Sequence, residues 1–169
     1  MVKYNIFKLL EISIKLVKII FDLRGKNMYQ IAYVKSENEL KPVLEFSYNI
    51  LGQHLREVEN YKYKDWKERI DVYSELLVYA HVDDTVISVV LGRKENNDSL
   101  VMGFVACDEN FRMKGITKQL IIQFEINAKK LGFKYITLGA YREAEEFYKK
   151  CGYRILKNIH NQNIFEKSL

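Results

Sequence analysis

The strongest constraint on the fold is an apolar run that leads, through a short basic turn, into a helix. Leu100–Cys107 reads LVMGFVAC and predicts a buried strand, and NFRMKGITKQL follows from Asn110 to Leu120. The first turn of a helix leaves its N–H groups without partners, and the helix dipole adds partial positive charge there. A strand that turns directly into such a helix directs these donors to one point, which favours an anion.

The side chains of this turn fit the same interpretation. Gly115 permits an unusual backbone angle and the close approach of a bulky phosphate. Arg112 and Lys114 add positive charge, and Thr117 offers a hydroxyl as well as its N–H group. Neither the triphosphate pattern GxxxxGK[ST] nor the dinucleotide pattern GxGxxG is found here. The turn predicts a site for a pyrophosphate-sized anion, although an ordinary exposed turn can carry the same residues.

The first half of the chain predicts one strand, two helices and then a run of strands. Ser36 and Glu39 form a capping-box pattern at the start of the first of these helices, which contains Pro42. Turn residues separate the later strands. The predicted elements are a strand at Tyr29–Val34, helices at 36–51 and Tyr61–Val72, and strands at Leu76–Val82, Val86–Leu91 and Leu100–Cys107.

In the second half, helices and strands alternate. Gly132 and Gly152 are placed to end the two helices. The expected order is helix Thr117–Leu131, strand Lys134–Gly139, helix Glu143–Lys150 and strands Tyr153–Leu156 and Asn163–Glu166. Antiparallel strands followed by this alternation predict an α/β fold with a mixed, mostly antiparallel central sheet flanked by helices. We expect one such domain over residues 28–169.

Residues 1–27 are expected to form a separate amphipathic helical extension. Charged residues recur every three or four positions, and apolar residues cover most of the remaining circumference. This apolar surface is expected to pack on its own domain or on a second subunit in a homodimer. Contact with a membrane surface is the less favoured alternative. The charges argue against a spanning helix or a signal peptide, and Met28 is an alternative start.

The net charge of +5 does not indicate a nucleic-acid partner, because most of it lies in the N-terminal segment. That segment holds six basic and two acidic residues, namely Lys3, Lys8, Lys15, Lys18, Arg24 and Lys26 against Glu11 and Asp22. Cys107 and Cys151 form no CxxC pair, so reduced thiols in a cytoplasmic protein are expected. The three scattered histidines have no metal-ligand spacing, so no metal is expected.

The second half resembles the GCN5-related N-acetyltransferase (GNAT) family. That family has a strand, then [RQ]-x-x-G-x-[GA] opening a helix, a second strand, and a short helix that ends in Tyr before a Gly-aromatic pair. Here Arg112–Thr117 fills the first motif, and Phe147-Tyr148 with Gly152-Tyr153 fills the last. The resemblance is specific in this half, and only topological between Tyr29 and Leu100.

The resemblance implies acetyl-CoA as the donor of an acetyl group. The N–H groups of the turn would hold its pyrophosphate, which assigns Arg112, Met113, Lys114, Gly115, Ile116 and Thr117. The strands at Leu100–Cys107 and Lys134–Gly139 would splay apart, and the pantetheine arm would pair with the first as an added strand does. Gly103 inside that strand is compatible with a bulge or a close backbone approach. Backbone N–H groups of Val105, Ala106 and Cys107 would stabilise the oxyanion.

Tyr148 matches the family's tyrosine and is expected to give a proton to the departing thiolate. The general base stays unassigned, because His81, Asp108 and Glu109 are more readily explained as turn residues. Cys107 has no His partner nearby in sequence, so a small buried apolar role is preferred to that of a nucleophile.

Two positions depart from the family pattern. Thr117 replaces a small residue, which narrows the turn but keeps the N–H group. Tyr141, three residues before Ala144, stands where many members carry an Asn that binds pantetheine; both positions remain assigned to the cofactor site. The predicted function is N-acetyl transfer to a primary amine of a small molecule or a protein by direct attack in a ternary complex. The alternative is a catalytically weak CoA-binding regulatory or scaffold module.

Overall fold

The computed structural model describes residues 29–160 and 162–169, and Ile31–Leu169 form one compact unit. The predicted extension over residues 1–27 lies outside the described residues. The strands are β1 (Gln30–Tyr33), β2 (Leu77–Val82), β3 (Thr85–Lys94), β4 (Ser99–Cys107), β5 (Tyr135–Ala140), β6 (Arg154–Ile159) and β7 (Gln162–Ser168). The main helices are α2 (Glu37–Leu51), α3 (Tyr63–Tyr73), α4 (Ile116–Lys130) and α5 (Glu145–Lys150).

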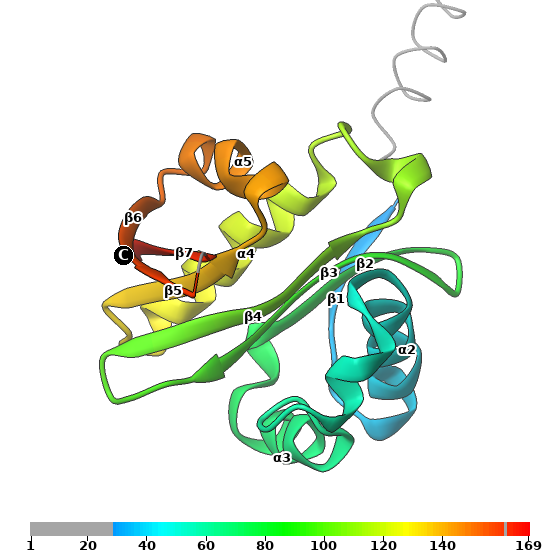
Figure 1. The fold of residues 1–169 in the computed structure, drawn as a ribbon. Helices are drawn as coiled ribbons and strands as arrows, with labels where there is room; N and C mark the ends of the chain where they lie inside the picture. Colours follow the sequence, from blue (N-terminus) through cyan, green and yellow to red (C-terminus); the bar gives the residue numbers. More distant parts are fainter. Residues whose placement is uncertain (1–28, 161) are drawn as a thin grey trace, which may run out of the picture. The chain divides into compact units, whose positions relative to one another are not determined.

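The strands form one seven-stranded sheet in the order β1-β2-β3-β4-β5-β7-β6. The pairs β2/β3, β3/β4, β5/β7 and β6/β7 are antiparallel, whereas β4 and β5 are parallel. Helices α2 and α3 cover one face of the sheet, and α4 and α5 cover the other (Figure 1). The predicted α/β fold with a mixed, mostly antiparallel sheet is confirmed.

The capping box at the start of α2 is present. Ser36 Oγ accepts from the Glu39 N–H at 3.4 Å, and Glu39 Oε2 accepts from the Lys35 N–H at 2.7 Å. The carboxylate therefore bonds the backbone N–H of the residue before the cap, and it also accepts from the hydroxyl of the cap residue Ser36 at 3.3 Å. Pro42 lies inside the helix, where it removes one backbone hydrogen bond.

Apolar side chains of β2, β3 and β4 pack against α2 and α3 to form a buried cluster. Alternation along β4 places Leu100, Met102, Phe104 and Ala106 in buried positions. The cluster contains Val34, Leu40, Val43, Leu44, Tyr48, Trp66, Leu77, Val89, Leu91, Phe104 and Ala106. Because β4 crosses this core, its backbone is held firmly, and it can serve as a rigid platform for a site.

Candidate active site

The turn between β4 and α4 leaves a helix N-terminus open. Met113 and Gly115 have left-handed φ values of 61° and 78°, and Gly115 is the N-cap of α4 without a side-chain cap. The first helical backbone bond runs from the Gln119 N–H to the Gly115 carbonyl. Among the described residues, the four N–H groups from Gly115 to Lys118 therefore have no acceptor. This is the donor arrangement that the sequence predicted for a pyrophosphate.

The side chains around this turn leave its donors accessible. A Cβ built on Gly115 would meet no atom within 4 Å, so the space beside the turn is open. Arg112 and Lys114 are exposed, and the first turn of α4 holds no acidic residue. Arg112 Nε donates to the Cys107 carbonyl at 3.4 Å, which folds this side chain back toward the end of β4. The turn fits an anionic group on both charge and space.

Thr117 differs from expectation in one respect. Its hydroxyl lies 3.0 Å from Ser88 Oγ on β3, so it faces the sheet rather than the open turn. Ser88 is fully buried, and its hydroxyl also donates to the Ala106 carbonyl at 2.9 Å. The hydroxyl is therefore engaged with β3, whereas the Thr117 N–H keeps its place in the turn, and the assignment of Thr117 to the anion site stays a prediction. Sequence reasoning missed Ser88, because a lone serine in an apolar strand carries no motif.

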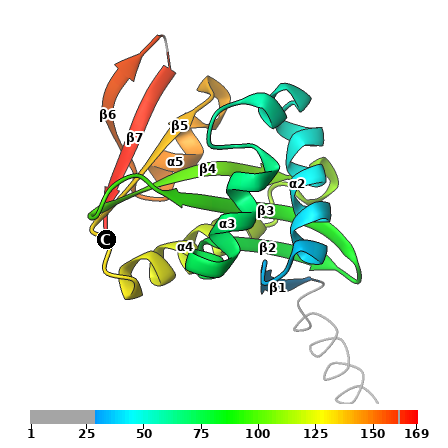
Figure 2. The same cartoon turned by 90° about the horizontal axis from the view of Figure 1, so that it is seen from below.

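Strands β4 and β5 separate soon after they meet. Their ladder has three pairs, from Ser99↔Tyr135 to Val101↔Thr137, and β5 then continues to Ala140 paired only with β7. Figure 2 shows the two strands diverging from their common end. The part of β4 beyond Val101 consequently has a backbone edge without a strand partner. We call the space between these diverging strands the gap.

The antiparallel ladder with β3 decides which backbone groups of β4 face the gap. The Asp108 N–H donates to the Ile87 carbonyl on β3 at 2.9 Å. Because backbone groups alternate between the two edges of a strand, those of Cys107 and Val105 turn toward the gap. The Ala106 carbonyl instead faces β3, where it accepts from Ser88. Cys107 is half-buried, which corrects the expectation of a buried side chain.

Tyr148 lies in α5, the helix that follows the end of β5. Its side chain is 6% exposed and packs edge-on against Phe147 and Tyr153. Burial, with a smaller effect from the neighbouring Cys151, raises the pKa of the Tyr148 phenol well above its usual range. The phenol is therefore protonated at neutral pH and able to donate a hydrogen bond.

Tyr141 and Ala144 lie where β5 passes into α5. The Ala144 N–H donates to the Tyr141 carbonyl at 2.9 Å, and the Tyr141 side chain is 59% exposed. A pocket of about 650 Å³ opens here, lined by Ala140, Tyr141, Arg142, Glu145, Gln162 and Asn163. Glu145 accepts from Asn163 Nδ2 at 2.8 Å, so β7 and α5 are joined across this pocket.

The residues considered for a general base lie in or beside turns, and Glu109 begins the 3-10 turn that follows β4. His81 is on β2, which β3 and β4 separate from β5, and its Nδ1 contacts the Asp83 carbonyl in the hairpin turn. Asp108 accepts from the Asn110 N–H at 2.9 Å and so shapes the turn after β4.

Within the described ranges, no group of three or more His, Cys, Asp or Glu residues is arranged to hold a metal ion. None of the described helices has the length and apolar character needed to cross a membrane.

The sheet order, the gap beside β4 and the open N-terminus of α4 define an acyl-CoA N-acyltransferase fold. A family model described as an acetyltransferase (GNAT) domain matches residues 45–166. The chain belongs to this family, which confirms the predicted family and the predicted enzyme class, an acetyl-CoA-dependent acyltransferase. No curated protein sequence matches the chain significantly.

Solved structures show the same fold at low sequence identity. PaiA N-acetyltransferase from Thermoplasma acidophilum, in complex with coenzyme A, is 19% identical with a TM-score of 0.69, covering 83% of this chain and 99% of that one. Arabidopsis thaliana Naa50, bound to the bisubstrate analogue CoA-Ac-MVNAL, is 20% identical with a TM-score of 0.66, covering 84% and 99%. Ard1 from Thermoplasma volcanium is 18% identical with a TM-score of 0.64, covering 84% and 98%.

Proposed function

We propose that this protein transfers the acetyl group of acetyl-CoA to a primary amine by direct attack in a ternary complex. The observation that carries the proposal is the unpaired edge of β4 beyond Val101, next to the four free N–H groups at the start of α4. An extended amide-bearing arm can pair with the first, and a diphosphate can accept from the second. Two structural neighbours bear CoA or a CoA conjugate, in line with this assignment.

The turn residues Arg112 to Thr117 would bind the diphosphate through their N–H groups. Val105 and Cys107 present backbone groups to the gap and would bind the pantetheine arm or the developing oxyanion. Tyr141 and Ala144, at the end of β5, would contact the same arm from the opposite side. Ala106 would not bind the arm directly, because its carbonyl accepts from Ser88 on the other edge of β4. Its contribution would be to hold the strand in place.

In the reaction, the lone pair of the neutral amine forms a C–N bond to the acetyl carbon while the C–S bond breaks. The sulfur leaves with the bonding electrons, and the proton lost by the new amide nitrogen balances the proton that the thiolate takes up. A phenol with a strongly raised pKa gives up its proton reluctantly to a thiolate, whose conjugate acid has a pKa of about 8.5. Tyr148 would therefore stabilise the thiolate by a hydrogen bond, with the proton arriving from solvent.

The acceptor is a primary amine of a peptide or a small molecule. The Naa50 neighbour carries a peptide conjugated to CoA, and the PaiA neighbour is named an N-acetyltransferase. Homodimer formation and membrane contact through residues 1–27 stay predictions, as does the cytoplasmic location that the free cysteines suggested.

The test is acetyl-CoA binding by calorimetry together with thiol release in the presence of an amine panel. Spermidine, a free Met-Val-Asn-Ala-Leu peptide and Nα-acetyl-lysine represent three acceptor classes. We expect binding of acetyl-CoA and acceleration by at least one amine. Binding without acceleration by any amine would favour the CoA-binding module, and absence of binding would refute the proposal altogether.

A further inference from the structure

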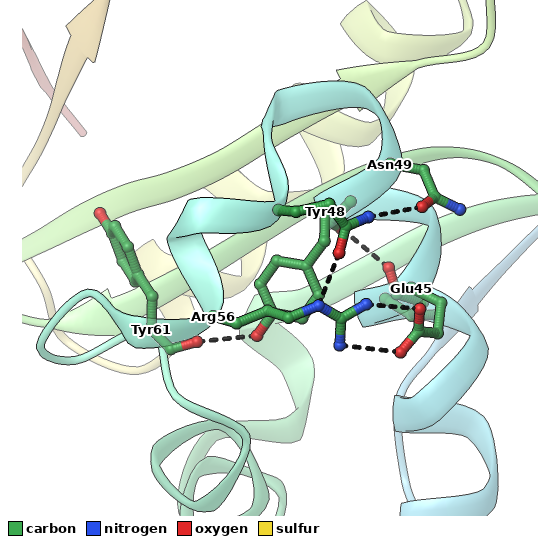
Figure 3. A network of polar contacts seen from close by, with 8 residues as sticks. Glu45, Tyr48, Asn49, Arg56 and Tyr61 are labelled. Atoms are coloured by element: carbon green, nitrogen blue, oxygen red, sulfur yellow. Dashed lines mark hydrogen bonds and ion pairs between the residues drawn. The ribbon is translucent and has the colours of Figure 1, made fainter.

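The connection between α2 and α3 is fixed in place by side chains of α2. Arg56 donates two hydrogen bonds to the Glu45 carboxylate, at 3.0 and 2.6 Å, and its guanidinium lies 4.5 Å from the centre of the Tyr48 ring. Gln53 donates to Asn49 at 2.7 Å in the next turn (Figure 3). Surface ion pairs contribute little singly, but a two-bond pair stacked on an aromatic ring restrains a loop.

Tyr61, at the end of this connection, is held from both its backbone and its ring. Its carbonyl accepts from Tyr48 Oη at 2.8 Å and from Trp66 Nε1 at 3.0 Å. Its ring stacks on Trp66 with an angle of 12° between planes, and lies 4.8 Å from the Phe104 ring of β4. Figure 3 shows its ring pointing away from the Glu45–Arg56 pair. Few degrees of freedom remain for this side chain.

The ring of Tyr61 lies on Gly103, the residue of β4 that pairs with neither β3 nor β5. Leu91 pairs with Phe104 and Gly92 pairs with Met102, so Gly103 is an extra residue that bulges from the β3 ladder. It also follows Val101, the last residue that β5 pairs. A Cβ built on Gly103 would lie 3.0 Å from Tyr61 Cε1 and 3.1 Å from Tyr61 Oη. The phenol therefore lies against the bulge, at the edge of the gap.

Packing alone does not account for the hydroxyl. Tyr61 is only partly buried, and within the described part of the chain its Oη has no hydrogen-bond partner, although Tyr48 and Trp66 each use their polar atom. A phenylalanine would fill the same space. A rigidly held, partly exposed and unpaired polar group beside unpaired backbone is the arrangement expected of a ligand contact.

The candidate donor site and Tyr61 lie on opposite faces of the sheet. The open turn before α4 and Tyr148 of α5 belong to the face covered by α4 and α5, whereas Tyr61 belongs to the α2 and α3 face (Figure 1). If the donor occupies the first face, an amine reaches the acetyl carbon from the second. Tyr61 stands at the point where that approach meets β4.

We propose that Tyr61 is an acceptor-binding residue, whose Oη accepts a hydrogen bond from the N–H of the incoming primary amine. This inference rests on the proposed function and deepens it. The bond orients the nitrogen lone pair toward the acetyl carbon, and Tyr61 itself exchanges no proton. Orientation of this kind acts on the amine alone, so the affinity for acetyl-CoA does not depend on the hydroxyl.

Tyr61→Phe tests the inference, because it removes the hydroxyl and leaves the ring packed between Trp66 and Phe104. Tyr63→Phe is the matched control, since the Tyr63 hydroxyl at the start of α3 already donates to Glu37 at the start of α2, at 3.0 Å. Steady-state rates are measured in the full chain with spermidine and the Met-Val-Asn-Ala-Leu peptide, together with the acetyl-CoA Kd and the Tm of each variant.

We expect Tyr61→Phe to lower kcat/KM for the amine about tenfold, as for one lost hydrogen bond. Its acetyl-CoA Kd and its Tm remain those of the unaltered protein, and Tyr63→Phe matches the unaltered protein in all three. Unchanged amine kinetics in Tyr61→Phe, or an equal loss in Tyr63→Phe, overturns the inference. If the proposed function itself is wrong, the unaltered chain will not bind acetyl-CoA. That result distinguishes a wrong function from a wrong role of Tyr61.

Discussion

Replacing Gly115 by alanine should have two effects that can be measured separately. One is on the stability of the fold, and the other is on the affinity for acetyl-CoA. Gly115 has φ of 78° and open space where a Cβ would point, so the substitution meets no atom of the protein. The left-handed conformation alone destabilises an alanine by about 1–2 kcal/mol. Gly132, at the other end of α4, provides the matched control, because its φ is 88° and it too has nothing within 4 Å.

We therefore expect Gly115→Ala and Gly132→Ala to lower Tm equally without ligand, by about 2–4 °C per kcal/mol for a chain of this size. Only Gly115→Ala places a methyl group where the diphosphate would approach the free N–H groups. Loss of one charge-assisted hydrogen bond is worth about 1.5–3 kcal/mol, which raises the acetyl-CoA Kd at least tenfold.

The assay is thermal unfolding with and without acetyl-CoA at 100 times the Kd of the unaltered protein, supported by calorimetry. This concentration stabilises the unaltered protein and Gly132→Ala by about 2.7 kcal/mol. A tenfold weaker Kd reduces the stabilisation of Gly115→Ala to about 1.4 kcal/mol. Equal ligand stabilisation in the two variants would refute the assignment of this turn to the diphosphate.

Three further predictions concern buried polar groups. Ser88→Ala removes the bonds to Ala106 and Thr117, so we expect a several-fold higher KM for acetyl-CoA with little change in kcat; Thr117→Ser, which keeps the hydroxyl, should behave like the unaltered protein. Tyr148→Phe should lower kcat about ten- to a hundredfold, the value of one hydrogen bond to a charged group, with an unchanged acetyl-CoA Kd. An unchanged kcat would argue against a role for its phenol. Burial, together with the nearby Glu125, raises the pKa of Tyr153 far above its usual range. Unfolding exposes a phenol with a pKa of about 10, so the free energy of unfolding is unaffected below that pH and falls by about 1.4 kcal/mol per pH unit above it for each such tyrosine. Urea unfolding at pH 7 and pH 11 should show a smaller alkaline loss in Tyr153→Phe, and an unchanged loss would contradict this cause.

Local sequence patterns predicted the elements closely. The helices and strands of the second half begin and end near the predicted residues, because glycines and apolar periodicity mark these boundaries directly. The start of α5 was placed too early, since Arg142–Ala144 form a separate 3-10 turn. Strand β6 extends to Ile159, beyond the predicted Leu156, because pairing with β7 continues along a polar stretch.

Contacts between distant segments were not predictable in the same way. The Thr117 hydroxyl was assigned to the anion site because the turn was considered alone, yet Ser88 on β3 engages it. Sequence also gave no reason to select Tyr61, one tyrosine among twelve. Its position follows from the bulge at Gly103 and from two donors to its carbonyl, features that exist only after the sheet and the α2–α3 connection have folded.

This difference explains why the donor could be inferred from the sequence and the acceptor could not. In the proposed site, the diphosphate would be bound by backbone N–H groups in one continuous turn, so a short motif ending in Gly115 and Thr117 suffices to predict it. The amine would be bound by side chains that several elements bring to the gap, and no spacing along the chain encodes such an arrangement. Substitutions in the α2–α3 connection should therefore change acceptor choice while acetyl-CoA binding is retained. Arg56→Gln, which breaks the pair with Glu45 far from the turn before α4, should alter the relative rates with spermidine and the peptide; unaltered relative rates would show that the connection does not shape the acceptor site.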